Sequence, residues 1–158
     1  MKSTPEAGAA PKLADLRERA LRLLARREHS RFELARKLGQ AGFAAADIAP
    51  LLDEFEQKNW LSDRRFAESY VADHRARSGA VKLAYELKQR GIADAVIEKV
   101  VQDNRDSELE RAHEIRRKKF GTPPANAQER VTQMRFLRGR GFSSDVINRV
   151  TSSKETDC

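Results

Sequence analysis

The stretch RGIADAVIEKVV, Arg90 to Val101, has two relatives in the same chain. They are AGFAAADIAPLL from Ala41 to Leu52 and RGFSSDVINRVT from Arg140 to Thr151. In each stretch a glycine is followed at once by a large apolar residue, and an isoleucine follows five positions after that residue. The three glycines lie about fifty residues apart, a period that indicates one structural unit repeated in tandem.

The repeated pattern has a local physical cause. A leucine stands four residues before each glycine, and the glycine can adopt the left-handed backbone conformation that ends a helix. The apolar residue after it folds back onto that helix, so each copy predicts helix, tight turn, helix. The residues that define the repeats are Leu38, Gly42, Phe43 and Ile48; Phe66, Tyr70, Leu87, Gly91, Ile92 and Ile97; and Leu137, Gly141, Phe142 and Ile147.

The turn glycines predict how the chain responds to substitution. Valine at any of the three positions is expected to cost about 1–2 kcal/mol through backbone strain. We expect less overall loss at Gly42 and Gly141 than at Gly91, because only the middle repeat supports two neighbours.

A further helix is expected before each pattern, so we predict an all-α fold of three tandem three-helix, helix-turn-helix-like repeats. Units this small have marginal cores and should pack in series, as an elongated and curved array. The expected boundaries are a disordered tail over 1–12, repeats over 13–60, 61–104 and 105–151, and a second tail over 152–158.

Several residues set the expected helix boundaries. Ser30, Ser62 and Ser143 are expected to cap helices. Pro50 fits best in a first helical turn, which predicts a helix start near Ala46 or Asp47. Gln133 stands where the other repeats have leucine, so Met134 or Phe136 is expected to carry the packing there.

The composition excludes several function classes. The one cysteine is the final residue, Cys158, and no apolar signal or membrane-length segment is present, so we expect a cytoplasmic protein. The three histidines lie far apart without metal-ligand spacing, and no phosphate-binding loop motif occurs. We therefore expect no enzyme activity, no metal and no cofactor.

Positive charge is concentrated near the C-terminus. Between Arg111 and Arg149 stand ten Lys or Arg against three acids, and the rest of the chain is balanced, so this segment carries the whole net charge of +7. Such a local excess is typical of a surface that meets phosphates.

The segment LSDRRFAESYVADHRARSGAVKLAYELKQRGI, Leu61 to Ile92, closely resembles the signature of the RecX family, bacterial regulators of the RecA recombinase. The flanking repeats agree with that family's three tandem three-helix repeats, so the resemblance covers roughly Leu13 to Thr151. Pro50 and Gln133 depart from the repeat pattern and put the local helix geometry in doubt.

The resemblance implies a monomeric, non-enzymatic protein of DNA repair, homologous recombination and the SOS response. Such a protein binds in the groove of the RecA filament on single-stranded DNA and inhibits strand exchange and ATP hydrolysis by RecA. Weak binding to single- and double-stranded DNA without sequence specificity is also implied. Whether inhibition proceeds by filament capping, groove occupancy or displacement of RecA is left open.

Basic residues of the second and third repeats are the candidate contacts with DNA or the RecA filament. They are Arg64, Arg65, Arg75, Arg77, Lys82, Lys88, Arg90, Arg116, Arg117, Lys118, Lys119, Arg130, Arg135, Arg138 and Arg140. Trp60, between the first two repeats, is interpreted as a buried junction residue, with base stacking as the alternative.

A tandem helix-turn-helix transcription regulator is the alternative function, because each repeat has the geometry of that motif. A sequence-specific reader usually concentrates its base contacts on one recognition helix, often within a symmetric dimer. The unevenly charged, nonidentical repeats favour the RecX interpretation.

Overall fold

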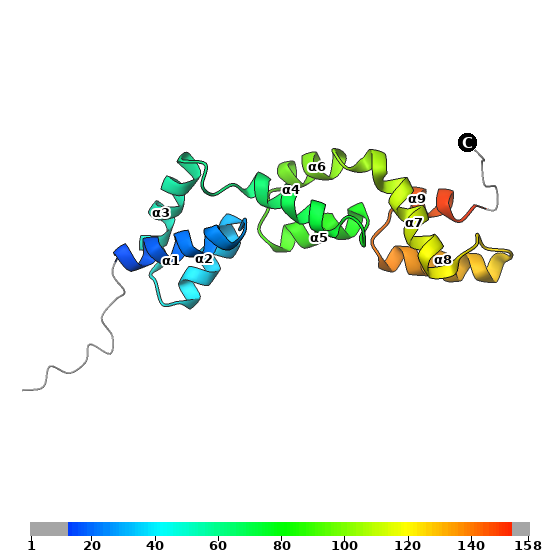
Figure 1. Ribbon diagram of the computed structural model, residues 1–158, viewed down its shortest axis with the longest axis horizontal. Coiled ribbons are helices and arrows are strands. Elements are labelled where there is room, and N and C mark those ends of the chain that lie inside the picture. Colours follow the sequence, from blue (N-terminus) through cyan, green and yellow to red (C-terminus); the bar gives the residue numbers. More distant parts are fainter. Residues whose placement is uncertain (1–12, 153–158) are drawn as a thin grey trace, which may run out of the picture. The chain divides into compact units, whose positions relative to one another are not determined.

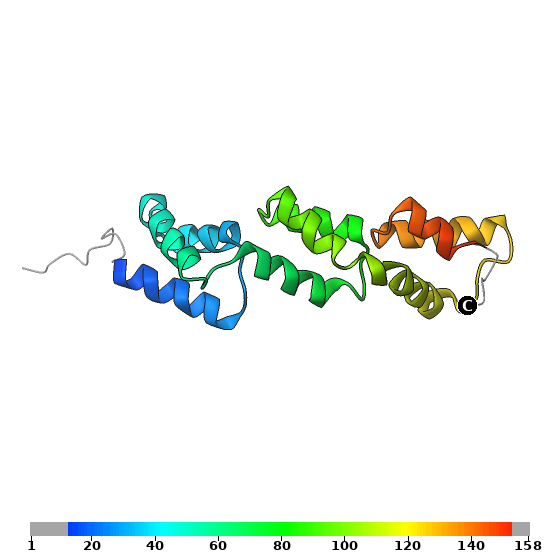
Figure 2. The ribbon, with the colours of Figure 1, turned by 90° about the horizontal axis from the view of Figure 1, so that it is seen from above.

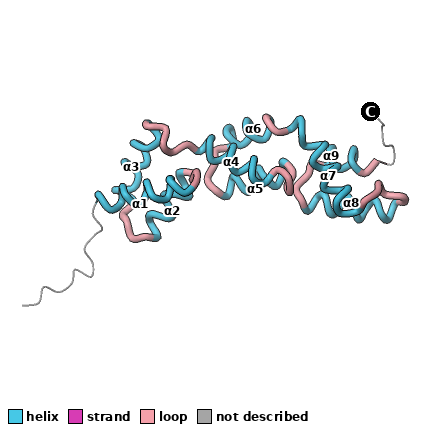
Figure 3. The backbone as a smooth tube through the Cα atoms, viewed as in Figure 1, coloured by secondary structure: helices cyan, strands magenta, loops and turns pink. Residues whose placement is uncertain are grey.

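The computed structural model describes residues 13–152, and this part of the chain contains helices and no strand (Figures 1 and 3). The prediction of an all-α fold is confirmed. The helices are α1 (Leu13–Arg26), α2 (Arg31–Gln40), α3 (Ala45–Gln57), α4 (Asp63–His74), α5 (Ala80–Gln89), α6 (Asp94–Gln102), the short 3₁₀ helix η1 (Arg105–Ser107), α7 (Glu108–Phe120), α8 (Ala127–Gly139) and α9 (Ser144–Val150). The tails expected over 1–12 and 153–158 lie outside the described residues.

The described chain forms two compact units. Unit 1 contains the residues up to Phe66 together with the short segment Arg90–Ile92. Unit 2 contains Ala67–Gln89 and the residues from Ala93 onward. Unit 1 therefore holds α1–α3 and the start of α4, and unit 2 holds the rest of the helices.

The glycine turns end helices as the sequence pattern predicts. Gly42, Gly91 and Gly141 have φ of 99°, 78° and 86°. After α2 the Gly42 N–H donates to Gly39 O at 3.0 Å and the Phe43 N–H to Leu38 O at 3.2 Å. The same pair of bonds follows α8, and it is the Schellman arrangement that satisfies the last carbonyls of a helix.

Serine caps begin several helices, as expected. The Ser30, Ser62 and Ser143 hydroxyls accept hydrogen bonds from the N–H groups of Glu33, Arg65 and Val146, respectively. These bonds satisfy donors that the first turn of a helix leaves open.

The predicted start of α3 is wrong by at least one residue. The helix begins at Ala45, so Pro50 lies in the helix interior rather than in its first turn. Proline there removes the hydrogen bond to the carbonyl four residues earlier. Its ring faces solvent, and the buried Ile48 and Leu52 on either side hold the helix against its core.

The core of unit 1 is apolar throughout. Helices α1, α2 and α3 build it together with Leu61, which lies between α3 and α4. Its buried residues are Leu16, Ala20, Leu34, Leu38, Ile48, Leu52, Phe55 and Leu61. Phe43 is only partly buried and packs against the edge of this cluster.

The core of the third repeat contains two polar residues at positions that are apolar elsewhere. Gln133 is 4% exposed and occupies the place of Leu34 and Leu83. The expected packing by Met134 and Phe136 is present, but it is added to the buried glutamine and does not replace it. Met134 and Phe136 are partly buried beside the apolar cluster around Leu137 and Ile147.

Arg116 is the second polar residue of this core. The helices α1, α4 and α7 each contain one fully buried alanine, and four residues after it stand Leu24, Val71 and Arg116. Arg116 is 5% exposed. The expectation that it belongs to a contact surface is therefore corrected, because its guanidinium lies inside the repeat.

Two of the turn glycines also let a second helix approach. Within unit 2 the end of α8 meets the start of α5, where the Gly79 N–H donates to Arg140 O at 2.8 Å and the Val81 N–H to Gly141 O at 2.9 Å (Figure 2). A Cβ on Gly141 would lie 2.1 Å from Cβ of Lys82. The glycine is thus required by φ and by this contact.

Unit 1 contains a related contact. The Ser30 hydroxyl donates to Arg90 O at 2.7 Å, and a Cβ on Gly91 would lie 2.3 Å from Cβ of Phe32. Gly42, in contrast, has no described atom within 4 Å of such a Cβ.

Candidate nucleic-acid interface

The third repeat presents a set of exposed basic side chains on α7 and α8. We call the exposed residues Arg117, Lys118, Lys119, Arg130, Arg135 and Arg138, with the partly buried Arg140, the third-repeat basic cluster. Its members come from the last turns of α7 and from the length of α8 and its C-cap. Cations in the last turn of a helix interact favourably with the helix dipole, which explains their local stability there.

Few acids neutralise this cluster. Glu114 lies 3.2 Å from the Arg117 guanidinium and 3.9 Å from the Lys118 ammonium. Within residues 13–152 no carboxylate forms a salt bridge with Arg130, Arg135 or Arg138. These three cations are therefore available to phosphates.

Several arginines of unit 1 form salt bridges with acids of the same unit. Arg31 pairs with Asp53 at 2.7 Å and with Glu56 at 3.0 Å, and its pKa is raised by hydrogen bonds to these two acids against the opposing effect of burial. Arg17 pairs with Glu54, and Arg65 with Glu28. These three arginines of unit 1 are thus neutralised within the protein, unlike Arg130, Arg135 and Arg138 of α8.

An aromatic pair lies among the cations of the third repeat. The Phe120 and Phe136 rings meet edge to face with centroids 5.4 Å apart. The Lys119 ammonium lies 5.6 Å from the Phe136 centroid, and the Arg140 guanidinium 5.2 Å from it. Cations interleaved with partly exposed aromatic rings are typical of surfaces that bind single-stranded nucleic acid.

The sequence did not single out Phe120 as a site residue, and it assigned Phe136 to packing. The signals were present in the chain, since Phe120 follows Lys119 directly and Phe136 stands four residues before Arg140. Residues four apart share a helix face. Only the packing of α7 on α8 brings the two rings together.

The remaining candidate contacts are divided between the two units. Arg64 is exposed on α4, and Arg90 contributes its backbone carbonyl to the contact with Ser30. In unit 2 the Arg75 guanidinium lies 3.5 Å from the Asn104 side chain, Arg77 O accepts a 3.4 Å bond from Arg140, and Lys88 lies 3.5 Å from Asp94. Arg77 and Lys82 lie beside the third-repeat basic cluster, since the Lys82 N–H donates to Gly141 O at 3.4 Å.

Arg111 has a structural role. Its guanidinium donates to three backbone carbonyls, those of Arg75 at 2.8 Å, Ser78 at 3.4 Å and Asn104 at 3.2 Å. Burial lowers the pKa of Arg111 from its usual value. This side chain contributes to the formal charge of the segment but not to its free surface.

Trp60 is not a buried core residue, which corrects the first interpretation of it. It is 44% exposed and packs against Phe55 with ring centroids 5.5 Å apart. The Lys58 ammonium lies 4.7 Å from its ring centroid. The Asn59 backbone, with φ of 59°, ends α3 and directs Trp60 to the edge of unit 1.

None of the helices within residues 13–152 combines the length and the apolar character that a bilayer crossing requires.

Comparison with known families matches all three repeats. Residues 17–55, 62–101 and 106–151 match the first, second and third three-helix domains of RecX, respectively. The chain is 40% identical over 154 residues to Regulatory protein RecX of Halorhodospira halophila, covering 96% of this chain and 94% of that protein. It is 46% identical over 132 residues to Regulatory protein RecX of Herbaspirillum seropedicae, covering 84% and 86%.

The fold is also similar to a solved structure. The crystal structure of RecX from Lactobacillus salivarius superposes with a TM-score of 0.77 at 19% sequence identity. The similarity covers 87% of this chain and 93% of that one. At this identity the match concerns the fold.

Proposed function

Because the chain belongs to the RecX family, we propose that it regulates the RecA recombinase by binding the RecA filament on single-stranded DNA. In this role it suppresses strand exchange and the hydrolysis of ATP by RecA. The observation that carries the proposal is the match of all three repeats, in order, to the three RecX domains.

The third-repeat basic cluster supports a contact with the DNA in that filament. Arg130, Arg135 and Arg138 are exposed and have no carboxylate partner in the described chain. Cations that are not neutralised by the protein release counterions from DNA when they bind phosphates, which gives affinity without sequence specificity.

Tandem repeats suit a partner that is itself repetitive. Several weak contacts on one chain raise each other's effective concentration, so the complex is tighter than any single contact. A chain that holds neighbouring RecA subunits in one relation opposes the rearrangements that accompany ATP turnover.

The experiment measures ATP hydrolysis and strand exchange by RecA on single-stranded DNA while the protein is titrated. We expect both rates to fall at amounts below one protein per RecA. Unchanged rates up to several proteins per RecA would overturn the proposal. Strong preference for one duplex sequence over competitor DNA would instead favour a helix-turn-helix transcription regulator.

A charge variant tests the role of the basic cluster. Replacing Arg130, Arg135 and Arg138 by serine should weaken binding to single-stranded DNA and lower the log-log salt slope by about one unit for each lost phosphate contact. The matched control replaces Arg19, Arg22 and Arg26 of α1, which are also exposed, and changes the net charge equally. If both variants lose the same affinity, the cluster on α7 and α8 is not the DNA contact.

A further inference from the structure

The buried side-chain atoms that lack a hydrogen-bond partner in the described chain all belong to the third repeat. They are Nε and Nη1 of Arg116 and Oε1 of Gln133. Buried polar groups in native proteins nearly always have a partner, so each exception requires an explanation such as a bound molecule. The two residues stand at positions that are apolar in the other repeats.

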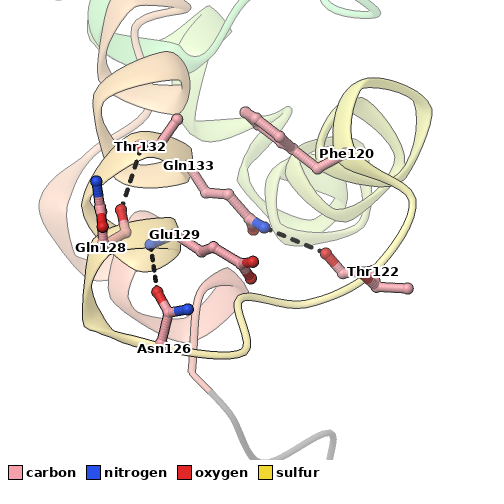
Figure 4. A pocket seen from close by; sticks show the side chains of 7 residues that line it. All are labelled: Phe120, Thr122, Asn126, Gln128, Glu129, Thr132 and Gln133. Carbon is pink, nitrogen blue, oxygen red and sulfur yellow. Dashed lines mark hydrogen bonds between the residues drawn. The ribbon is translucent and has the colours of Figure 1, made fainter.

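A cavity of about 450 Å³ adjoins Gln133 (Figure 4). Phe120, at the end of α7, forms one wall, and the loop residues Thr122 and Asn126 form another. Gln128, Glu129, Thr132 and Gln133 of α8 complete the lining. The volume falls in the range of pockets that take small organic ligands.

The hydrogen bonds inside the cavity leave specific groups open. The Gln133 amide donates to Thr122 O at 3.2 Å, which leaves its Oε1 as an acceptor without a donor. One Glu129 oxygen accepts the Ala125 N–H at 2.8 Å, and the other makes no hydrogen bond within residues 13–152. The Asn126 side chain uses its oxygen to cap α8, so its amide N–H groups are open.

This lining selects the chemistry of an occupant. It contains one carboxylate and no cation, so an anion is disfavoured inside it. It offers one open carboxylate oxygen, open amide donors and one aromatic ring. The buried Gln133 Oε1 is a second acceptor that a turn of the amide would bring to an occupant. These groups fit a planar molecule that carries both donors and acceptors. Nucleobases have this combination, and proteins read their edges in single strands with such side chains while an aromatic ring stacks on them.

The residues beside the cavity favour a base that is attached to a phosphate backbone. Lys119 immediately precedes Phe120, and Arg130 immediately follows Glu129, and both side chains are exposed. Both cations belong to the third-repeat basic cluster, which supplies contacts for the phosphates of a strand whose base enters the cavity. The same surroundings disfavour a cationic side chain of a protein partner.

We propose that this cavity binds a single unstacked base of single-stranded DNA and prefers guanine. Guanine is the base with two adjacent donors on its pairing edge, N1–H and the N2 amino group. They match the open oxygen of Glu129 and, once the Gln133 amide turns toward the cavity, its unpartnered oxygen. Its O6 accepts from the amide groups of Asn126 or Gln128, and Phe120 stacks on the ring. The inference rests on the proposed contact between the third repeat and DNA, and it adds a base preference to it.

The test uses the full chain and short dye-labelled oligothymidines that carry one central guanine, deoxyinosine or thymine. We expect fluorescence anisotropy to show the guanine strand binding at least about fivefold more tightly than the all-thymine strand, the lower limit for a well-placed base contact. Deoxyinosine, which lacks the N2 amino group, should lose most of that preference. Equal affinities for the three strands would overturn the proposal.

Two variants locate the preference. Glu129→Gln keeps a residue able to accept the Ala125 N–H before α8 and removes one negative charge. It should abolish the guanine preference, while the lost negative charge raises the affinity for all three strands by the same factor. Gln133→Leu restores the residue type of the other repeats and should reduce the preference while raising the melting temperature. A preference that survives in both variants would place guanine elsewhere.

RecA inhibition is measured on the same samples to separate the two proposals. Normal inhibition with equal strand affinities would overturn the base site and leave the proposed function standing. Loss of inhibition in Glu129→Gln without any base preference in the wild type would mean that the cavity receives a protein side chain, which also overturns the base site.

Discussion

Alanine at Gly141 should destabilise the protein more than alanine at Gly42, although both glycines end a helix with positive φ. The conformational cost of a side chain at such a φ is about 1–2 kcal/mol at either position. At Gly42 this is the whole cost, because a Cβ there meets no described atom within 4 Å.

At Gly141 the new Cβ collides with Cβ of Lys82 and with its backbone nitrogen 2.7 Å away. The start of α5 must move from the end of α8, which breaks the bonds from Gly79 N–H to Arg140 O and from Val81 N–H to Gly141 O. Two hydrogen bonds contribute about 1–3 kcal/mol together. The total for Gly141→Ala is therefore about 2–5 kcal/mol, against about 1–2 kcal/mol for Gly42→Ala.

Urea unfolding followed by two signals measures the difference. Trp60 is the single tryptophan and lies in unit 1, so its fluorescence reports that unit, while far-ultraviolet circular dichroism reports all helices. Gly42→Ala should shift the fluorescence transition modestly, and Gly141→Ala should shift the circular dichroism transition further with little change in fluorescence. Equal losses of unfolding free energy in the two variants would refute the reasoning.

Three other changes give distinct expected outcomes. Ser30→Ala removes both a helix cap and the hydrogen bond to Arg90 O, so it should lower the free energy of unfolding in urea by about 2–3 kcal/mol. Ser143→Ala removes only a cap and should cost about 1 kcal/mol. Equal costs would contradict the role of Arg90. Pro50→Ala restores a helical N–H and should raise the unfolding free energy by about 1–3 kcal/mol; a loss would show that the proline fits α3 without strain. Burial lowers the pKa of His29, so the unfolded state binds more protons than the folded state below about pH 6.5. The free energy of unfolding should therefore fall from pH 7 to pH 5, and it should fall less in His29→Gln. Parallel pH profiles of the two proteins would contradict this.

The neutral state of His29 has a structural basis that sequence reasoning missed. Its Nδ1–H donates to Arg27 O at 3.0 Å, and its Nε2 accepts from the Lys37 ammonium at 3.0 Å. A proton on Nε2 would face that ammonium. The spacing of the histidines did not indicate this, because Lys37, eight residues later in the chain, reaches the ring only when α2 is formed.

The sequence was most informative where the structure depends on local interactions. The pattern around Leu38, Gly42 and Phe43 predicted a helix end because the hydrogen bonds that close it join residues at most five apart. The serine caps were predictable for the same reason.

Side-chain environments were less predictable because they depend on contacts between distant segments. Arg116 and Gln133 are residue types that usually lie at the surface, and only the helix register places them in a core. Trp60 is of a type that usually lies inside, yet the Asn59 turn leaves it at the edge. The cavity beside Phe120 likewise requires the longer connection from α7 to α8, whose fold no periodicity describes.

The open space beside Gly42 leaves room for a further repeat on the N-terminal side of the first one. Residues around Ser30, at the start of α2, approach Gly91, and residues around Gly79, at the start of α5, approach Gly141. The equivalent position at Gly42 has no described neighbour. A duplicated repeat inserted ahead of α1 would find there a turn with the same backbone geometry and no side chain in the way. Lengthening by gene duplication would therefore require no new turn chemistry at the N-terminal side, and a four-repeat protein could be built by grafting one more copy at that position.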